Sequence, residues 1–71
     1  MNVNDPRSLG IALRSRRKEL NYSQAFLSEF SGLSVSFISD VENGKPTAEI
    51  GRIFQLAGLL GLDIKLEARG K

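Results

Sequence analysis

The side chains best suited to covalent or metal chemistry are missing from this sequence. It contains no cysteine and no histidine, so thiolate and imidazole ligands, the thiol nucleophile and the usual general base are all absent. Serine, aspartate, glutamate and lysine are present, but no motif arranges them for catalysis. We therefore expect a protein that is not an enzyme and that holds no metal ion and no cofactor.

The side chains that remain are suited to hydrogen bonding, and many of them lie in residues 23–44. This stretch holds two short amphipathic segments on either side of Ser31-Gly32-Leu33-Ser34. Two short helices joined by a tight turn that contains glycine are typical of a helix-turn-helix, whose second helix enters the major groove of duplex DNA. The stretch therefore predicts DNA binding.

Charge and length fit a small binding domain. The formal charge is only +2, yet Arg14, Arg16, Arg17 and Lys18 form a local basic cluster, which is compatible with phosphate contact or with an ordinary solvated helix. No apolar run approaches the roughly 20 residues of a membrane span, and the N-terminus lacks the apolar core of a signal peptide. We expect one cytoplasmic domain without membrane contact, stabilised by a second copy because it is so short.

Caps and apolar spacing predict the first two helices. Asp5-Pro6 opens the first, and Asn21-Tyr22 ends it. Ser23 caps the second, and Gly32 stops it in the left-handed region. The apolar residues expected to face the core are Leu9, Leu13 and Leu20 in the first helix, and Ala25, Leu27 and Phe30 in the second.

The same signals predict two further helices. Ser34 caps the third, which Asn43-Gly44 closes, and Thr47 caps the fourth, which Gly61 ends. The apolar residues expected to point inward are Leu33, Ile38 and Val41 at the third helix, and Ile50, Ile53, Phe54, Leu56, Ala57 and Leu60 in the fourth. Gly51 and Gly58, inside the fourth helix, are expected to permit a close helix contact.

From residue 62 the apolar period changes to two, which is the period of a half-buried strand. The apolar positions are Leu62, Ile64, Leu66 and Ala68. A lone strand needs a partner for its backbone groups, so we expect it to pair with the same strand of a second copy, unless the alternation is accidental and the tail is frayed.

Charge favours one register of that antiparallel pair. Centring on Lys65 opposes Asp63 to Glu67, which repel. Centring on Leu66 matches Lys65 with Glu67 and Asp63 with Arg69, and centring on Ile64 matches Asp63 with Lys65. We favour the Leu66 register. The expected organisation is a DNA-binding domain at 5–61, a dimerising strand at 62–69, and flexible ends at 1–4 and 70–71.

Several motifs together resemble the xenobiotic-response-element, or Cro and C1 repressor type, helix-turn-helix family. They are Ser23-Gln24-x-x-Leu27, Gly32-Leu33-Ser34 and Ile38-Ser39-x-Val41-Glu42-Asn43-Gly44. The resemblance covers roughly residues 8 to 62 and implies an all-α, four-helix, lambda-repressor-like domain, here with one C-terminal β-strand. The tail after Leu59-Leu60-Gly61-Leu62 further resembles HipB-type antitoxins, which repress their own operon and hold a HipA-type serine/threonine kinase toxin.

The resemblance implies roles for particular residues. The positions implied to face DNA bases are Ser34, Val35, Ser36, Ser39 and Asp40. The positions implied to contact phosphates are Ser23, Gln24, Asn43, Gly44 and Lys45. Asp40 either accepts from a cytosine amino group or stays solvated. Because the third helix offers no Arg or Gln for bidentate base contact, specificity leans on DNA shape and on half-site spacing.

Two further expectations concern residues near this surface. Arg17 and Glu42 match a family ion pair that ties the first helix to the end of the third, so Arg17 is expected to be structural. Phe37, at a position where the family often has a small polar residue, is expected to be partly buried against the second helix.

Three hypotheses of function remain. The first is a homodimeric, operator-binding repressor that regulates its own operon and is the antitoxin of a HipA-like kinase toxin. The second is a free-standing repressor without a toxin partner. The third is a protein-interaction module that has kept the fold and no longer binds DNA.

Overall fold

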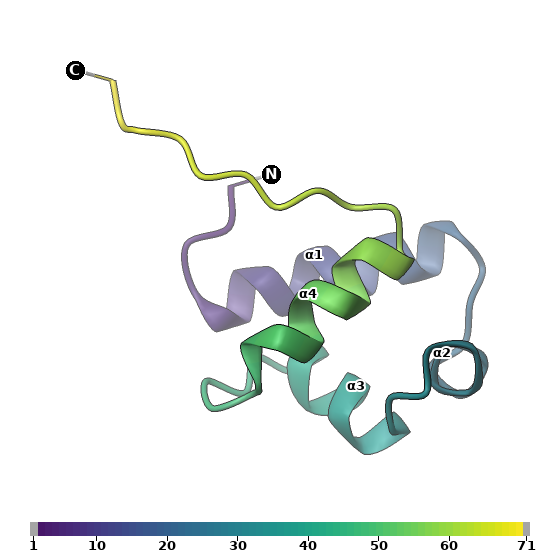
Figure 1. Ribbon diagram of the computed structural model, residues 1–71. Helices are drawn as coiled ribbons and strands as arrows, with labels where there is room; N and C mark the ends of the chain where they lie inside the picture. Colours follow the sequence, from purple (N-terminus) through teal and green to yellow (C-terminus); the bar gives the residue numbers. More distant parts are fainter. Residues whose placement is uncertain (1, 71) are drawn as a thin grey trace.

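Four helices make up the fold in the computed structural model, which describes residues 2–70. They are α1 (Pro6–Glu19), α2 (Gln24–Ser31), α3 (Val35–Glu42) and α4 (Ile50–Leu59). α1 and α4 lie one behind the other, α3 lies beside them, and α2 lies at the end of the molecule away from the N-terminus (Figure 1). The expected all-α, four-helix fold is confirmed.

The first three helices begin where their capping side chains predict. The Ser8 backbone N–H donates to Asp5 Oδ1 at 2.7 Å, and Ser8 Oγ in turn accepts from the Asp5 N–H at 3.2 Å, which is a capping box. Hydrogen bonding of the Asp5 carboxyl to the Ser8 backbone N–H, and also to the Ser8 side chain, holds the pKa of Asp5 below its ordinary value. Ser23 Oγ accepts from the Phe26 N–H and Ser34 Oγ from the Phe37 N–H, so each short helix has one of its free N–H groups satisfied.

Left-handed residues mark the ends of the helices. Gly32, Gly44 and Gly61 have φ of 78°, 84° and 72°, and Asn21 has φ of 61°. Glycine and, less readily, asparagine adopt this conformation at low cost, which is why they follow helix ends.

The start of the fourth helix was wrongly expected at Thr47. Lys45 to Ala48 form a turn, with the Ala48 N–H donating to the Lys45 carbonyl at 3.4 Å. The helix begins at Ile50 after Glu49, whose side chain makes no capping bond within residues 2–70. A serine or threonine caps a helix only where the backbone directly after it is helical. Here residues 45–48 form a turn, so the helix begins later in the chain.

The core collects one or more apolar residues from each helix and from the α2–α3 turn. Its buried members are Leu13, Leu27, Leu33, Ile38, Val41, Ile53, Leu56, Ala57 and Leu60. Leu9, Leu20 and Phe37 are partly buried against it, so the expected stripe of the first helix and the partial burial of Phe37 are confirmed. Burying such side chains is the main term that stabilises the fold.

Some residues expected in the core are exposed instead. Ala25 and Phe30 lie on the outer side of α2, where Phe30 stacks on Phe26 with ring centroids 6.0 Å apart. Ile50 and Phe54 are 66% and 55% exposed, and both line a groove between α1, α4 and the tail. Helical spacing shows which apolar residues share one face of a helix. It does not show whether the rest of the same chain packs against that face.

The close helix contact lies at Gly10 in α1 rather than at Gly51 or Gly58. A Cβ atom on Gly10 would collide with the Val41 carbonyl oxygen and lie 2.7 Å from that of Glu42. Beyond the neighbouring residues and backbone of α4 itself, no atom of the described residues lies within 4 Å of a Cβ built on Gly58, and only Glu49 Oε1 lies at 4.0 Å from one on Gly51. The expectation for those two glycines was wrong, and Gly10 instead lets α1 approach the end of α3.

Residues 62–70 are extended and form no strand within the chain. The tail is anchored where the Leu62 N–H donates to the Ala57 carbonyl at 2.9 Å, and it then runs past α1 and α4 toward the N-terminal segment (Figure 1). Pairing of this segment across a dimer stays a prediction. The expected flexible ends include Met1 and Lys71, which lie outside the described residues. No helix within residues 2–70 is long and apolar enough to cross a membrane.

Candidate nucleic-acid interface

The outer face of α3 is open and lined by short side chains. Ser34, Val35 and Ser36 are exposed, and Ser39 and Asp40 are half-buried. Ser34 Oγ accepts from the Phe37 N–H at 3.0 Å, so its own hydroxyl proton stays available to an outside acceptor. Val35, 43% exposed, offers a branched methyl surface of the kind that contacts thymine methyl groups.

Three polar contacts join α3 to the loop that follows it. Lys45 Nζ lies 3.4 Å from Asp40 Oδ2, with both side chains about half exposed, and the Lys45 N–H donates to the Asp40 carbonyl at 2.9 Å. Asn43 Nδ2 donates to Ser39 Oγ at 3.4 Å. Asp40 is therefore neither simply solvated nor free, since its charge is balanced by Lys45. An exposed pair of this kind contributes at most about 1 kcal/mol, so the lysine can exchange to another anion.

A buried network ties three helices together beneath this face. Arg17 Nε donates to Glu42 Oε2 at 2.7 Å, and Arg17 Nη2 donates to Glu42 Oε1 at 3.0 Å. Arg17 Nη1 also donates to the Tyr22 carbonyl at 2.8 Å. Both residues are more than 90% buried, and the hydrogen bond to Glu42 raises the pKa of Arg17. The arginine thus lies in a structural position, as the family pattern implies.

Gln24 joins that network from α2. Its Nε2 donates to Glu42 Oε1 at 3.0 Å, which fixes the first turn of α2 against the end of α3. The amide nitrogen carries two N–H donors, and the second is available for an outside acceptor such as a phosphate. Ser23, directly before it, is exposed and uses its Oγ to cap the helix at 2.9 Å.

Gly44 occupies a position that requires glycine. Its φ is 84°, and a Cβ atom there would lie 3.0 Å from Arg7 Cα. A larger residue would strain the backbone and push the loop away from α1. The loop at residues 43–45 is therefore held against both α1 and α3.

The structure brings most of the candidate DNA-contact residues together around α3, and it places the candidate dimer residues elsewhere. Gln24 is linked to α3 through Glu42, and Asn43 and Lys45 are linked to it through Ser39 and Asp40. The candidate dimer residues lie elsewhere, on the tail: Leu62 is half-buried, while Ile64, Leu66 and Ala68 are exposed.

Two contacts that position the helices were not predicted from the sequence. Gly10 sets the distance between α1 and α3. Arg16 Nε donates to the Leu60 carbonyl at 2.8 Å and so ties α1 to the end of α4, where the tail starts. A glycine inside an otherwise helical pattern is a signal for close approach, but a bond from a side chain to a backbone carbonyl leaves no mark on the residue pattern.

This arrangement of a capped short helix, a glycine turn and an open second helix defines a helix-turn-helix protein. The helix-turn-helix family model matches residues 13–66, and the chain belongs to this family. The family is not enzymatic, in agreement with the expectation from composition.

Two relatives extend the comparison. An "uncharacterized HTH-type transcriptional regulator y4mF" of Sinorhizobium fredii is 39% identical over 97% of this chain and 91% of the relative. The "ImmF control region 10 kDa protein" of Bacillus phage phi105 is 29% identical over 87% of this chain and 69% of the relative.

Two solved structures share the fold. One is described as "HipB-O4 20mer complex", and the other is a complex of a HipB variant with an O2 20mer. Both have a TM-score of 0.88, with 21% and 23% identity. Each comparison covers 99% of this chain and 99% or 97% of the other, so the fold is shared along nearly the whole length.

Proposed function

We propose that this chain is a homodimeric DNA-binding repressor that recognises an operator of its own operon. The observation that carries the proposal is the Arg17–Glu42–Gln24 network, because it holds the start of α2 and the end of α3 in one rigid unit below an open helix face. Binding residues placed on rigid elements can match a duplex without an ordering cost. The relative described as a transcriptional regulator supports the same function.

In this proposal α3 enters the major groove. Val35 contacts a thymine methyl group, and the hydroxyls of Ser34, Ser36 and Ser39 donate to base edges or to nearby phosphates. Asp40 accepts from a cytosine amino group once Lys45 moves to a phosphate. None of these side chains makes the bidentate contact of arginine or glutamine, so DNA shape supplies part of the specificity.

Contacts to the phosphates frame that helix on two sides. Ser23 and Gln24 meet one strand at the start of α2, where unpaired backbone N–H groups favour an anion. Asn43, Gly44 and Lys45 meet the backbone beyond the end of α3. Lys45 is the strongest single contact of this group because it carries a full positive charge, and its weak pair with the half-exposed Asp40 is readily exchanged for a phosphate.

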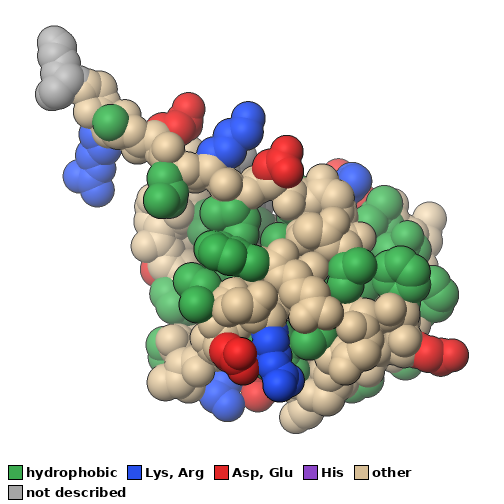
Figure 2. Space-filling model, in the orientation of Figure 1, with side chains coloured by type: hydrophobic (Ala, Val, Ile, Leu, Met, Phe, Trp, Pro, Cys, Tyr) green, Lys and Arg blue, Asp and Glu red, His purple; other side chains and the backbone are tan. Residues whose placement is uncertain are grey.

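In this proposal a second copy of the chain pairs through the tail, so that the dimer presents two DNA-binding surfaces. Leu66 is 97% exposed, and Ile64 and Leu66 line a groove together with Ile50 and Phe54. Apolar side chains gather below the tail, over α1 and α4 (Figure 2). Pairing Leu62, Ile64, Leu66 and Ala68 with the same residues of a second chain covers this surface. The Leu66-centred register pairs its charges best.

We also propose that the dimer is the antitoxin of a HipA-like serine/threonine kinase toxin. The shared fold with HipB, which includes the tail, supports this assignment. A free-standing repressor is the second candidate, favoured by the relative from a phage control region. Co-purification with the product of the neighbouring gene separates the two, since only the antitoxin carries a kinase.

Selection from a random duplex pool tests the proposed function. We expect an enriched motif with two-fold symmetry and half-sites about one helical turn apart. A chain that enriches no motif, and that binds no duplex at low salt, is instead an interaction module that has kept the fold. The matched control is Val35→Asp, which places a carboxylate on the DNA-facing side of α3 and should abolish enrichment without unfolding the exposed first turn of that helix.

A further inference from the structure

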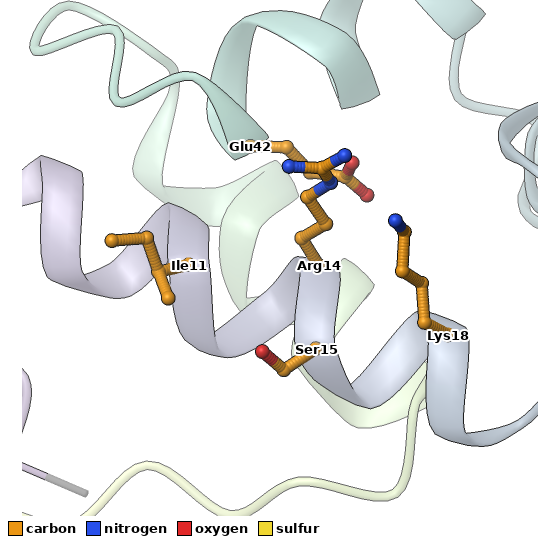
Figure 3. A pocket seen from close by; sticks show the side chains of 5 residues that line it. All are labelled: Ile11, Arg14, Ser15, Lys18 and Glu42. Carbon is orange, nitrogen blue, oxygen red and sulfur yellow. The ribbon is translucent and has the colours of Figure 1, made fainter.

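A shallow hollow on α1 lies next to the buried ion pair. It is lined by Ile11, Arg14, Ser15 and Lys18 of α1 and by Glu42 at the end of α3. The side chains of Arg14 and Lys18 extend from α1 toward Glu42, and their charged ends lie on the same side of the helix (Figure 3). Two of the residues that line the hollow, at the junction of α1 and α3, are therefore cations.

Within the described part of the chain, these two cations have no acidic partner. The basic side chains that form ion pairs in residues 2–70 are Arg16, Arg17, Lys45 and Arg52, and neither Arg14 nor Lys18 is among them. Glu42 does not neutralise them, because its two oxygens already accept two bonds from Arg17 and one from Gln24. One carboxylate thus stands against three cations, and the junction carries a local excess of positive charge.

The position of the hollow decides which anion it fits. Glu42 borders the hollow and also bonds Gln24, the first residue of α2, so the hollow adjoins the helix start that faces a phosphate in the proposed complex. Residues four apart on a helix have Cβ atoms about 6 Å apart. Two long cationic side chains that start at that spacing can direct their charged ends to different oxygens of one phosphate group.

We propose that Arg14 and Lys18 bind one phosphate of the DNA backbone in each protomer. This extends the DNA interface from α2 and α3 onto α1, and it rests on the proposed function because it assigns further residues to the same complex. The basic cluster in the sequence then divides into two parts: Arg16 and Arg17 hold the fold, while Arg14 and Lys18 meet the ligand.

The test compares two double variants that differ in charge. Arg14→Gln/Lys18→Gln removes both cations, and Arg14→Lys/Lys18→Arg keeps both charges at the same positions. Each is titrated by fluorescence anisotropy against a labelled duplex of about 30 base pairs, long enough for two half-sites a helical turn apart, at several salt concentrations. The duplex carries the sequence upstream of the chain's own gene.

The expected result is a change in the salt dependence. With two protomers bound, loss of two phosphate contacts makes the slope of log K against log salt less steep by about 2. If the two proteins bind equally at about 1 M salt, affinity near 0.1 M salt then falls roughly 60-fold. The charge-keeping variant retains the slope of the unchanged protein. Thermal melting should be the same for all three, because both side chains are exposed and form no ion pair among residues 2–70.

Two outcomes contradict the assignment, and they are distinguishable. If the unchanged protein binds with a steep slope and the glutamine variant matches it, the cations of α1 are solvated and only this inference fails. If the unchanged protein binds no duplex at low salt, the proposed function fails and the inference fails with it.

Discussion

Replacing Arg17 with alanine tests the structural centre of the interface. The change leaves Glu42, which is only 8% exposed, as a buried carboxylate without its cation. It also removes the bidentate contact at 2.7 and 3.0 Å and the bond to the Tyr22 carbonyl. Breaking a buried pair by removing one partner costs about 3–5 kcal/mol. A domain of 71 residues has a total stability of roughly 4–11 kcal/mol.

The expected result is therefore a large loss of stability. A loss of about 3 kcal/mol lowers the Tm of a domain this size by about 12–24 °C, measured by circular dichroism and supported by urea unfolding. The control removes both partners: in Arg17→Met/Glu42→Leu no charge is left buried, so most of the stability should return. If Arg17→Ala melts like the unchanged protein yet binds DNA more weakly, the arginine is a ligand contact and the reasoning is wrong.

Three further changes test other parts of the structure. Gly10→Ala should lower the free energy of unfolding by about 2–3 kcal/mol, because the added methyl group meets backbone carbonyls of α3. Gly58→Ala is the control: its methyl group faces open space among the described residues, so the free energy of unfolding should rise by up to about 1 kcal/mol. Equal urea midpoints for the two variants would contradict the close contact at Gly10. The hydrogen bonds of Ser8 lower the pKa of Asp5 from its ordinary value of 3.8. The charged cap therefore stabilises the fold above pH 3.8, and this stabilisation is lost as the pH falls through the lower pKa of the folded state. The difference in unfolding free energy between the unchanged protein and Asp5→Ala should shrink on acidification, and a constant difference would refute a charged cap. Ile64→Asp should give a monomer in analytical ultracentrifugation and weak operator binding, while Lys65→Ser stays dimeric; a dimeric Ile64→Asp variant would exclude pairing through the tail.

Local signals determined most of the helix boundaries. Ser23 and Ser34 each bond a backbone N–H three residues later, and Gly32 and Gly44 adopt the left-handed backbone. These features depend on a few neighbouring residues, so the sequence reveals them. Thr47 is the exception, because whether a hydroxyl caps a helix depends on the turn in which it lies.

The exposure of Ile50 and Phe54 could not be predicted from their spacing. Helical period shows which residues share a face, but not whether a single chain covers that face. A glycine inside a helix, such as Gly10, is a signal for close approach. Which segment comes close depends on how α1 crosses α3, and no local pattern specifies that. The link between Arg17 and Glu42 spans 25 residues, and the family pattern, rather than spacing, pointed to it.

The contact of Gln24 with Glu42 sharpens the role of the glutamine. The family pattern implies a phosphate contact together with support for the recognition helix, and the structure places the side chain in the buried network. The same amide can serve both partners because it carries two N–H donors. Position in a motif identified the residue, but only the folded arrangement identifies the acceptor.

The most direct test of the central claim is the binding of the purified protein to its upstream duplex as salt is raised. We predict two chains per duplex, and a linear fall of log K with log salt whose slope reflects several phosphate contacts in each protomer. Stable chains that bind no duplex at low salt, or that bind as single copies with affinity unaffected by salt, would contradict it.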